Sequence, residues 1–146
     1  MLIIMFKITA ETKQHLTEDP KKIAIALHNI FPEEIKEKKL GDVIYLSIES
    51  QKTSSLENLY ELFRHQRILD VARKTLRNNV IDNTTHFYIN KQVAFVNKIN
   101  FCEEEGESPL GPIRITIEYD DIERLIDWLT PFTKNGAEVT LVRKFP

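Results

Sequence analysis

The sequence predicts an α+β fold, a two-layer sandwich in which helices pack on one face of a mainly antiparallel sheet. Several segments alternate apolar and polar residues, which predicts strands with one buried side. Other segments carry a single apolar stripe at helical spacing, as helices at the surface of a core do. The 146 residues are 42% hydrophobic and 29% charged, a composition that suits a folded core. We therefore expect a single α+β domain over residues 1–146.

Strands are expected wherever apolar and polar residues alternate. The clearest case is 113–118, where three isoleucines share one face, so this strand belongs in a half-buried antiparallel sheet. Residues 35–39 are highly charged and precede the turn candidate Gly41-Asp42, which predicts the edge strand of a hairpin. The expected strands cover residues 4–11, 35–39, 43–49, 86–89, 98–101, 113–118 and 137–142.

Helix starts are indicated by residues that can cap a first turn. Asp19 precedes Pro20, and proline loses no hydrogen bond at the first helical position. Ser54 and Glu57 have the spacing of a capping box, in which each side chain bonds the other residue's backbone N–H. The expected helices cover residues 19–31, 54–64, 67–78, a short turn capped by Asn90, and a last helix capped by Asp120 or Asp121.

A break is expected near His65-Gln66. The apolar residues before Arg64 lie on a different side of a helical projection from those after Arg67. One straight helix cannot bury both stripes, so two helices are predicted. His65 is expected to pack toward the buried side of the second helix.

The segment from Arg64 to Arg77 is the only strongly basic stretch, with five cations against the single carboxylate of Asp70. Arginine and lysine at one-turn spacing can contact successive phosphates. The alternative is a solvated helix face on which Asp70 pairs with neighbouring cations three or four residues away. Because the formal net charge of the chain is −2, nucleic-acid binding requires such local clustering.

Other chemistry has little support in the sequence. Cys102 is the only cysteine, the four histidines lack metal-ligand spacing, and the four glycines are isolated. We therefore expect no metal site, no cofactor and no catalytic site. The glutamates between Glu103 and Glu107 indicate a flexible acidic loop rather than a cation site. No apolar run is long enough to span a bilayer and no signal peptide is evident, which predicts a cytoplasmic protein.

Three stretches together resemble an uncharacterised archaeal protein family of predicted RNA-binding function. The stretches are Gln66–Asp70 with Ala72-Arg73, Asn90–Ala94 with Asn100-Phe101, and Ser108–Ile113 with Ile126–Leu129. The resemblance covers nearly the whole chain and implies a fold similar to that of the fifth large-subunit ribosomal protein. It implies nucleic-acid contacts at Arg67, Arg73 and Lys91. The charge pattern adds Arg64, Lys74, Arg77 and Lys98.

The sequence thus predicts a non-enzymatic RNA-binding protein of translation or RNA processing, whose partner is structured or ribosomal RNA. If the target is single-stranded, exposed aromatic side chains such as Tyr88 or Phe95 must stack on bases. The alternative is a protein-interaction module or homo-oligomeric structural protein without nucleic-acid binding. In that case Trp128, which is expected to be half exposed, makes a homodimer contact or packs against a strand.

Overall fold

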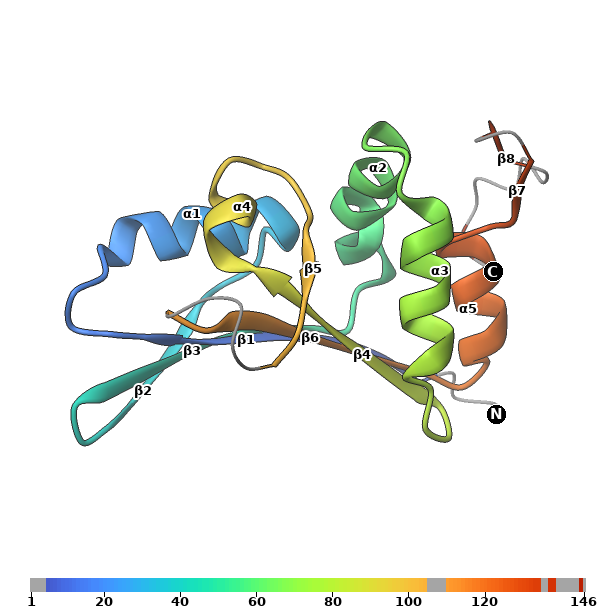
Figure 1. Cartoon of the computed structure of the whole chain (residues 1–146). Coiled ribbons are helices and arrows are strands. Elements are labelled where there is room, and N and C mark those ends of the chain that lie inside the picture. The colour runs from blue at the N-terminus through green and yellow to red at the C-terminus, as the bar shows by residue number, and fades with distance from the viewer. Residues whose placement is uncertain (1–4, 105–109, 135–136, 139–144, 146) are drawn as a thin grey trace.

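Six antiparallel strands form one sheet in the computed structural model, which describes residues 5–104, 110–134, 137–138 and 145. The strand order is β2-β3-β1-β6-β4-β5 (Figure 1). The strands are β1 (Phe6–Gln14), β2 (Lys36–Leu40), β3 (Val43–Ser50), β4 (Thr84–Asn90), β5 (Phe101–Cys102) and β6 (Pro112–Tyr119). A separate pair is formed by β7 (Thr133–Lys134) and β8 (Ala137–Glu138).

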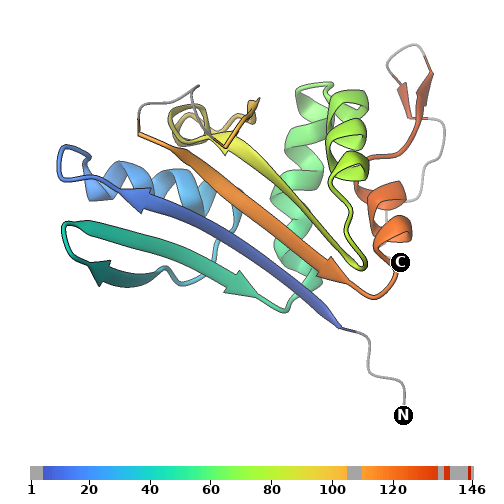
Figure 2. The same ribbon diagram turned by 60° about the horizontal axis from the view of Figure 1, so that its bottom comes forward.

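All five helices of the described residues lie on one side of the six-stranded sheet, and no described helix covers its other face (Figure 2). This arrangement confirms the predicted two-layer α+β sandwich. No helix in this part of the chain is long and apolar enough to cross a membrane. The helices are α1 (Pro20–Ile30), α2 (Glu57–His65), α3 (Leu69–Asn78), α4 (Lys91–Phe95) and α5 (Ile122–Leu129), and a 3-10 turn (Thr53–Leu56) precedes α2.

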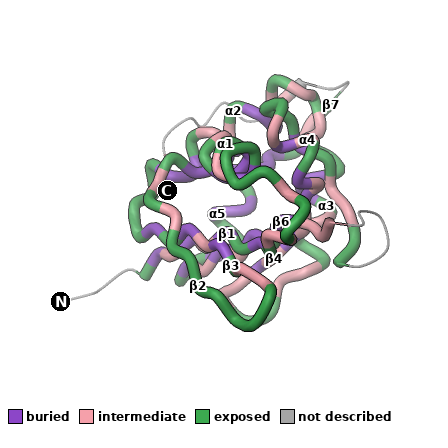
Figure 3. Tube along the Cα trace, turned by 90° about the vertical axis from the view of Figure 1, so that its left-hand side faces the viewer, coloured by how far each residue is buried: buried purple, intermediate pink, exposed green. Residues whose placement is uncertain are grey.

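The central strand β6 is buried on one side. Ile113, Ile115 and Ile117 are fully buried toward the helices, whereas Arg114 is exposed on the opposite face. Buried and less buried residues alternate in the same way along the neighbouring strands (Figure 3). The apolar periodicity of the sequence therefore correctly separates the covered face of the sheet from the uncovered one.

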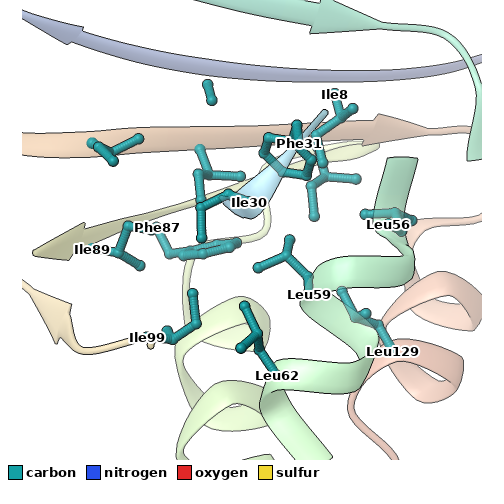
Figure 4. Close-up of a cluster of buried hydrophobic side chains, with 14 of the residues drawn as sticks. Ile8, Ile30, Phe31, Leu56, Leu59, Leu62, Phe87, Ile89, Ile99 and Leu129 are labelled. Carbon is teal, nitrogen blue, oxygen red and sulfur yellow. The ribbon is translucent and has the colours of Figure 1, made fainter. Parts of the chain in front are cut away.

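The core lies between the sheet and the helices. Ile8 of β1 and Phe87 of β4 point toward Phe31, which follows α1, and Leu59 of α2 (Figure 4). These four side chains are at most 1% exposed. The helices α1, α2, α3 and α5 each bury one apolar side in this layer.

Several local predictions are confirmed. The side chains of Asp19, Asn90 and Asp121 accept hydrogen bonds from the backbone N–H of the second or third residue of α1, α4 and α5. The predicted edge strand is β2, and all five of its residues are exposed. The hairpin turn at Gly41 has a φ of 62°, a backbone conformation that glycine adopts without strain.

The predicted break between two helices is also confirmed. α2 ends at His65 and α3 begins at Leu69. Between them Arg67 adopts a left-handed conformation with a φ of 57°. The Gln66 side chain ties the break to the segment before β5. It donates to the carbonyl of Ile99 (3.0 Å) and accepts from the N–H of Ile99 (2.6 Å).

The predicted capping box at Ser54 is wrong. α2 begins at Glu57 without a side-chain cap, because residues 53–56 form a 3-10 turn instead. That turn is held by Ser55, whose hydroxyl donates to Ser50 Oγ (2.7 Å) at the end of β3. A side-chain bond to an adjacent strand therefore replaces the local bond that the spacing predicts.

The predicted environments of His65 and Trp128 are wrong as well. His65 is exposed, because the chain turns away at the break before the second helix begins. Trp128 is buried, with 8% of its surface exposed. Its ring packs on Tyr60 of α2 and on Phe145, with ring centroids 4.8 and 5.0 Å away. These contacts come from segments distant in sequence, which the helical projection of α5 alone does not include.

Some expected boundaries differ from the structure. β1 continues to Gln14, beyond the predicted end at Glu11. The expected last strand, 137–142, contains β8, and its residues 139–142 lie outside the described residues. Residues 105–107 of the acidic loop and Ser108-Pro109 also lie outside them.

The one-sided burial of β6 predicts unequal effects of truncation at adjacent positions. Ile115→Ala should lower the free energy of unfolding by about 2–5 kcal/mol, because it leaves a cavity in the core. Thr116→Ala, on the uncovered face of the same strand, should lower it by less than about 1 kcal/mol. Urea denaturation of both variants measures the difference, and equal losses would contradict a sheet with one covered face.

Candidate nucleic-acid interface

The basic segment predicted to bind RNA folds as α2 and α3, and two of its arginines bind the C-terminal end of α5. Arg64 donates to the carbonyls of Trp128 and Leu129, each at 3.1 Å, and its guanidinium also pairs with Glu138. Arg73 donates to the carbonyl of Thr130 at 2.9 Å. Because the last carbonyls of a helix lack partners within it and carry partial negative charge, both arginines stabilise the end of α5.

Arg73 is almost fully buried, with 7% of its surface exposed. Its guanidinium also forms an ion pair with Asp127 of α5 at 2.8 Å and lies 3.7 Å from the ring centre of Phe132. Arg77, one turn later, pairs with Glu123 of α5 at 2.9 Å. Arg73 and Arg77 therefore both bind carboxylates of the adjacent helix α5.

Lys91 is the most deeply buried of the predicted contacts, with 3% of its surface exposed. Its ammonium group donates to the carbonyls of Lys13 (2.7 Å) and Leu110 (2.9 Å) and to both carboxylate oxygens of Glu18 (3.1 Å). Burial lowers the pKa of Lys91 below its usual value, although Glu18 acts in the opposite direction. Lys91 thus connects the end of β1, the loop before α1 and the loop before β6.

Arg77 is exposed although it pairs with Glu123. Three further predicted contacts are exposed: Arg67, Lys74 and Lys98. Within the described residues, none of these side chains forms an ion pair or a hydrogen bond. Asp70 does not pair with a neighbouring cation of its helix, as the alternative interpretation expected; it accepts from the hydroxyl of Thr133 at 2.6 Å. The seven predicted residues are therefore divided between four that are paired within the fold and three that are exposed and have no partner among the described residues.

The charge pattern of the sequence does not identify the cations on the uncovered face of the sheet. Lys13 of β1, Lys38 of β2 and Arg114 of β6 are exposed there, and no ion pair to a described residue involves them. Two tyrosines, Tyr45 of β3 and Tyr88 of β4, lie on the same face. Strand alternation identifies the side of each residue, but the cluster becomes visible only with the strand order.

Metal-ligating side chains do not gather in the part of the chain that the structure describes. No group of three histidine, cysteine, aspartate or glutamate side chains there could hold an ion.

A polar surface hollow of about 400 Å³ lies between α1 and α2 and includes His28, Glu61 and His65. The imidazole Nε2 of His28 is within hydrogen-bonding distance of the carbonyl of Glu33, at 2.9 Å.

Comparison with known proteins identifies the family. A family model described as RNA binding matches residues 7–119, which include the six strands of the main sheet except for Phe6, the first residue of β1. The chain belongs to this family. It is 47% identical to a UPF0201 protein of Sulfurisphaera tokodaii over 134 residues, which cover 91% of this chain and 92% of the relative. It is 41% identical to a UPF0201 protein of Sulfolobus acidocaldarius, with the same coverage.

A solved structure is similar over nearly the same length. The crystal structure of a UPF0201 protein from Methanococcus jannaschii has a TM-score of 0.80 and 32% sequence identity, and the match covers 92% of this chain and 99% of that chain. The resemblance to an archaeal family inferred from three stretches of sequence is thus confirmed at the level of the family.

The division of the basic residues predicts opposite effects at adjacent positions of α3. Arg73→Met should lower the free energy of unfolding by about 1–3 kcal/mol, because the buried carbonyl of Thr130 loses its donor. Lys74→Met, which removes an exposed cation from the next position, should change it by less than about 0.5 kcal/mol. Thermal or urea unfolding measures both values, and similar losses would contradict a structural role for Arg73.

Lys91→Met should be more damaging, with a loss of about 3–5 kcal/mol in the free energy of unfolding. The variant leaves the Glu18 carboxylate, 6% exposed, without its buried partner. Adding Glu18→Gln to this variant should restore part of the loss, because the uncompensated charge is then removed. Urea denaturation of the two single variants and the double variant measures the coupling, and strictly additive losses would contradict it.

Proposed function

We propose that this protein binds RNA without catalysing a reaction and acts in translation or RNA processing in the cytoplasm. The observation that carries the proposal is the match of the RNA-binding family over residues 7–119. The match includes nearly all of the main sheet and the helices α1 to α4, so the proposal concerns the body of the fold. The likeness to the fifth large-subunit ribosomal protein, predicted from sequence, makes structured or ribosomal RNA the first class of target to test.

The distribution of charge supports this proposal. Phosphate contacts supply most of the affinity of RNA-binding proteins and require cations that are accessible to the ligand. Arg67, Lys74 and Lys98 meet this condition on the helical layer, and Lys13, Lys38 and Arg114 meet it on the sheet. A protein whose overall charge is −2 can attract RNA through such local groups.

The alternative, a homo-oligomer that uses Trp128, has weaker support. The ring of Trp128 is 8% exposed and packs within its own chain on Tyr60 and Phe145. A buried ring cannot form the centre of an interface without a rearrangement of α5. We therefore keep self-association as an outcome to be measured rather than as a second proposed function.

Binding of the purified protein to RNA over a range of salt concentrations tests the proposal. We expect the logarithm of the affinity to fall linearly with the logarithm of the salt concentration, because RNA binding releases counterions. The panel contains an unpaired oligonucleotide, a hairpin and a duplex. Absence of binding to all three at low salt would contradict the proposed function.

A charge-reversal variant of the helical layer tests the contacts predicted from sequence. If the helical layer contacts RNA, as the sequence predicts, Arg67→Glu, Lys74→Glu and Lys98→Glu together should weaken binding and reduce its dependence on salt, because three exposed cations are replaced. Their exposure makes this variant suitable for comparison with the folded wild type by circular dichroism. Unchanged affinity and salt dependence would exclude this group from the RNA contact.

A further inference from the structure

The uncovered face of the sheet brings a tyrosine and two lysines into one row across three strands. In the register of the strands, Tyr45 of β3 is opposite Lys38 of β2 on one side and Lys13 of β1 on the other. The ammonium group of Lys13 lies 5.8 Å from the centre of the Tyr45 ring. Tyr45 is 37% exposed, so one aromatic ring with adjacent positive charge is open to a ligand.

A second aromatic group lies on the same face, toward the other edge of the sheet. Tyr88 of β4 is opposite Arg114 of β6, whose guanidinium lies 5.9 Å from the centre of the Tyr88 ring. His86 meets the Tyr88 ring edge-on, with centroids 5.8 Å apart. Partial burial raises the pKa of Tyr88; Arg114 acts against this shift, and Glu104 adds to it. The ring is therefore uncharged near neutral pH.

The charge of this face has the opposite sign to that of the chain. Five cations project from its strands against three carboxylates, and the carboxylate of Glu104 lies beside Tyr88, which leaves an excess of one positive charge in a chain with a net charge of −2. Lys7 pairs with Glu49 at 3.6 Å, whereas Lys13, Lys38 and Arg114 form no ion pair within the described residues. The cations are Lys7, Lys13, Lys36, Lys38 and Arg114, and the carboxylates are Glu11, Glu49 and Glu118.

Strand geometry fixes the spacing of the two aromatic groups. Tyr45 and Tyr88 are three strands apart in the sheet, and their positions along the strands differ by two residues in the register. With strands about 4.8 Å apart and a rise of about 3.3 Å per residue, the separation is about 16 Å. Sheet faces that bind RNA commonly stack two or three bases of one strand on their aromatic side chains.

We propose that the uncovered face of the sheet binds unpaired RNA nucleotides, with bases stacked on Tyr45 and Tyr88 and phosphates held by Lys13, Lys38 and Arg114. This inference rests on the proposed RNA-binding function and specifies the form of RNA and the surface. Any base can stack on an aromatic ring, but only when it is not already stacked inside a duplex. Unpaired loops or tails of a structured RNA are therefore the ligand that this face accepts.

The same observations disfavour a second copy of the chain as the occupant. The buried centres of interfaces between protein chains are depleted of charged residues. The strands project eight charged side chains from this face. Apart from the tyrosines, the large apolar side chain exposed on these strands is Leu40, at the hairpin end of β2. Such a surface, with positive charge and two aromatic rings set apart from each other, fits an RNA strand, which carries its bases at intervals along a negatively charged backbone.

Two adjacent lysines of β2 provide a matched test of the surface. Lys38 is opposite Tyr45 on the uncovered face, whereas Lys39 is opposite Ile44 and belongs to the other face, and both are exposed. Lys38→Gln and Lys39→Gln change the net charge of the chain equally. Lys38→Gln should weaken binding of an unpaired oligonucleotide several-fold and reduce the salt slope by about 0.7, the value for one phosphate contact on a single strand. Lys39→Gln should bind like the wild type.

Leucine substitutions test stacking separately from charge. Tyr45→Leu and Tyr88→Leu should each lower the affinity for the unpaired oligonucleotide by roughly 5- to 150-fold, the range expected for one lost base–aromatic contact. The salt slope should stay the same, because no phosphate contact is removed. Phe132→Leu, which replaces a ring that is 64% exposed beside Arg73, serves as the control and should bind like the wild type.

The outcomes separate this inference from the proposed function. If the wild type binds RNA but the Lys38 and Lys39 variants behave alike and both tyrosine variants keep full affinity, the inference is overturned and the function stands. If the wild type binds no RNA, both fail. Sedimentation of the same variants detects self-association, and a dimer lost in Tyr45→Leu with RNA binding unchanged would assign the face to a second copy and overturn the inference.

Discussion

The fold depends on a central strand that can bury only one of its faces. Ile113, Ile115 and Ile117 of β6 are fully buried, and the residues between them are polar. Because strand side chains alternate, a register shift of one residue would turn Arg114 and its polar neighbours into the core. Helices are therefore stable on one side of the sheet only. The opposite side of the sheet stays open to solvent and to a ligand. The same alternation makes that side polar.

The basic residues divide according to what lies next to them. Arg64 and Arg73 meet the carbonyls at the end of α5, and Lys91 meets a buried carboxylate and two carbonyls. Their charges hold separate segments together, and a ligand could use them only by breaking buried bonds. Cations on the open sheet, such as Lys38 and Arg114, have no comparable partner among the described residues. Local sequence charge density is thus a poor guide to available charge in this protein.

The sequence predicts most of the features that depend on neighbours along the chain, although the expected capping box at Ser54 is replaced by a contact with β3. The caps at Asp19 and Asn90 and the break before α3 follow from local spacing and are confirmed. The partners of Lys91 and Arg73 could not be predicted, because Glu18 is 73 residues from Lys91 and Asp127 is 54 residues from Arg73. The alternation of apolar and polar residues along β4 indicates the polar side of the strand for Tyr88, but only the strand order brings Tyr88 near Arg114. The candidate surface therefore emerges from the fold rather than from a motif.

The most direct test of the open-face account is a titration of ¹⁵N-labelled protein with a short unpaired RNA, followed by backbone and arginine side-chain resonances. We expect the largest shifts at residues of β1, β3, β4 and β6 that face away from the helices, including Tyr45, Tyr88 and Arg114. Residues of α5, on the covered side, should shift little. Shifts confined to the helical layer around Arg67 and Lys74 would contradict the account, because the RNA would then bind the side of the molecule opposite the open sheet.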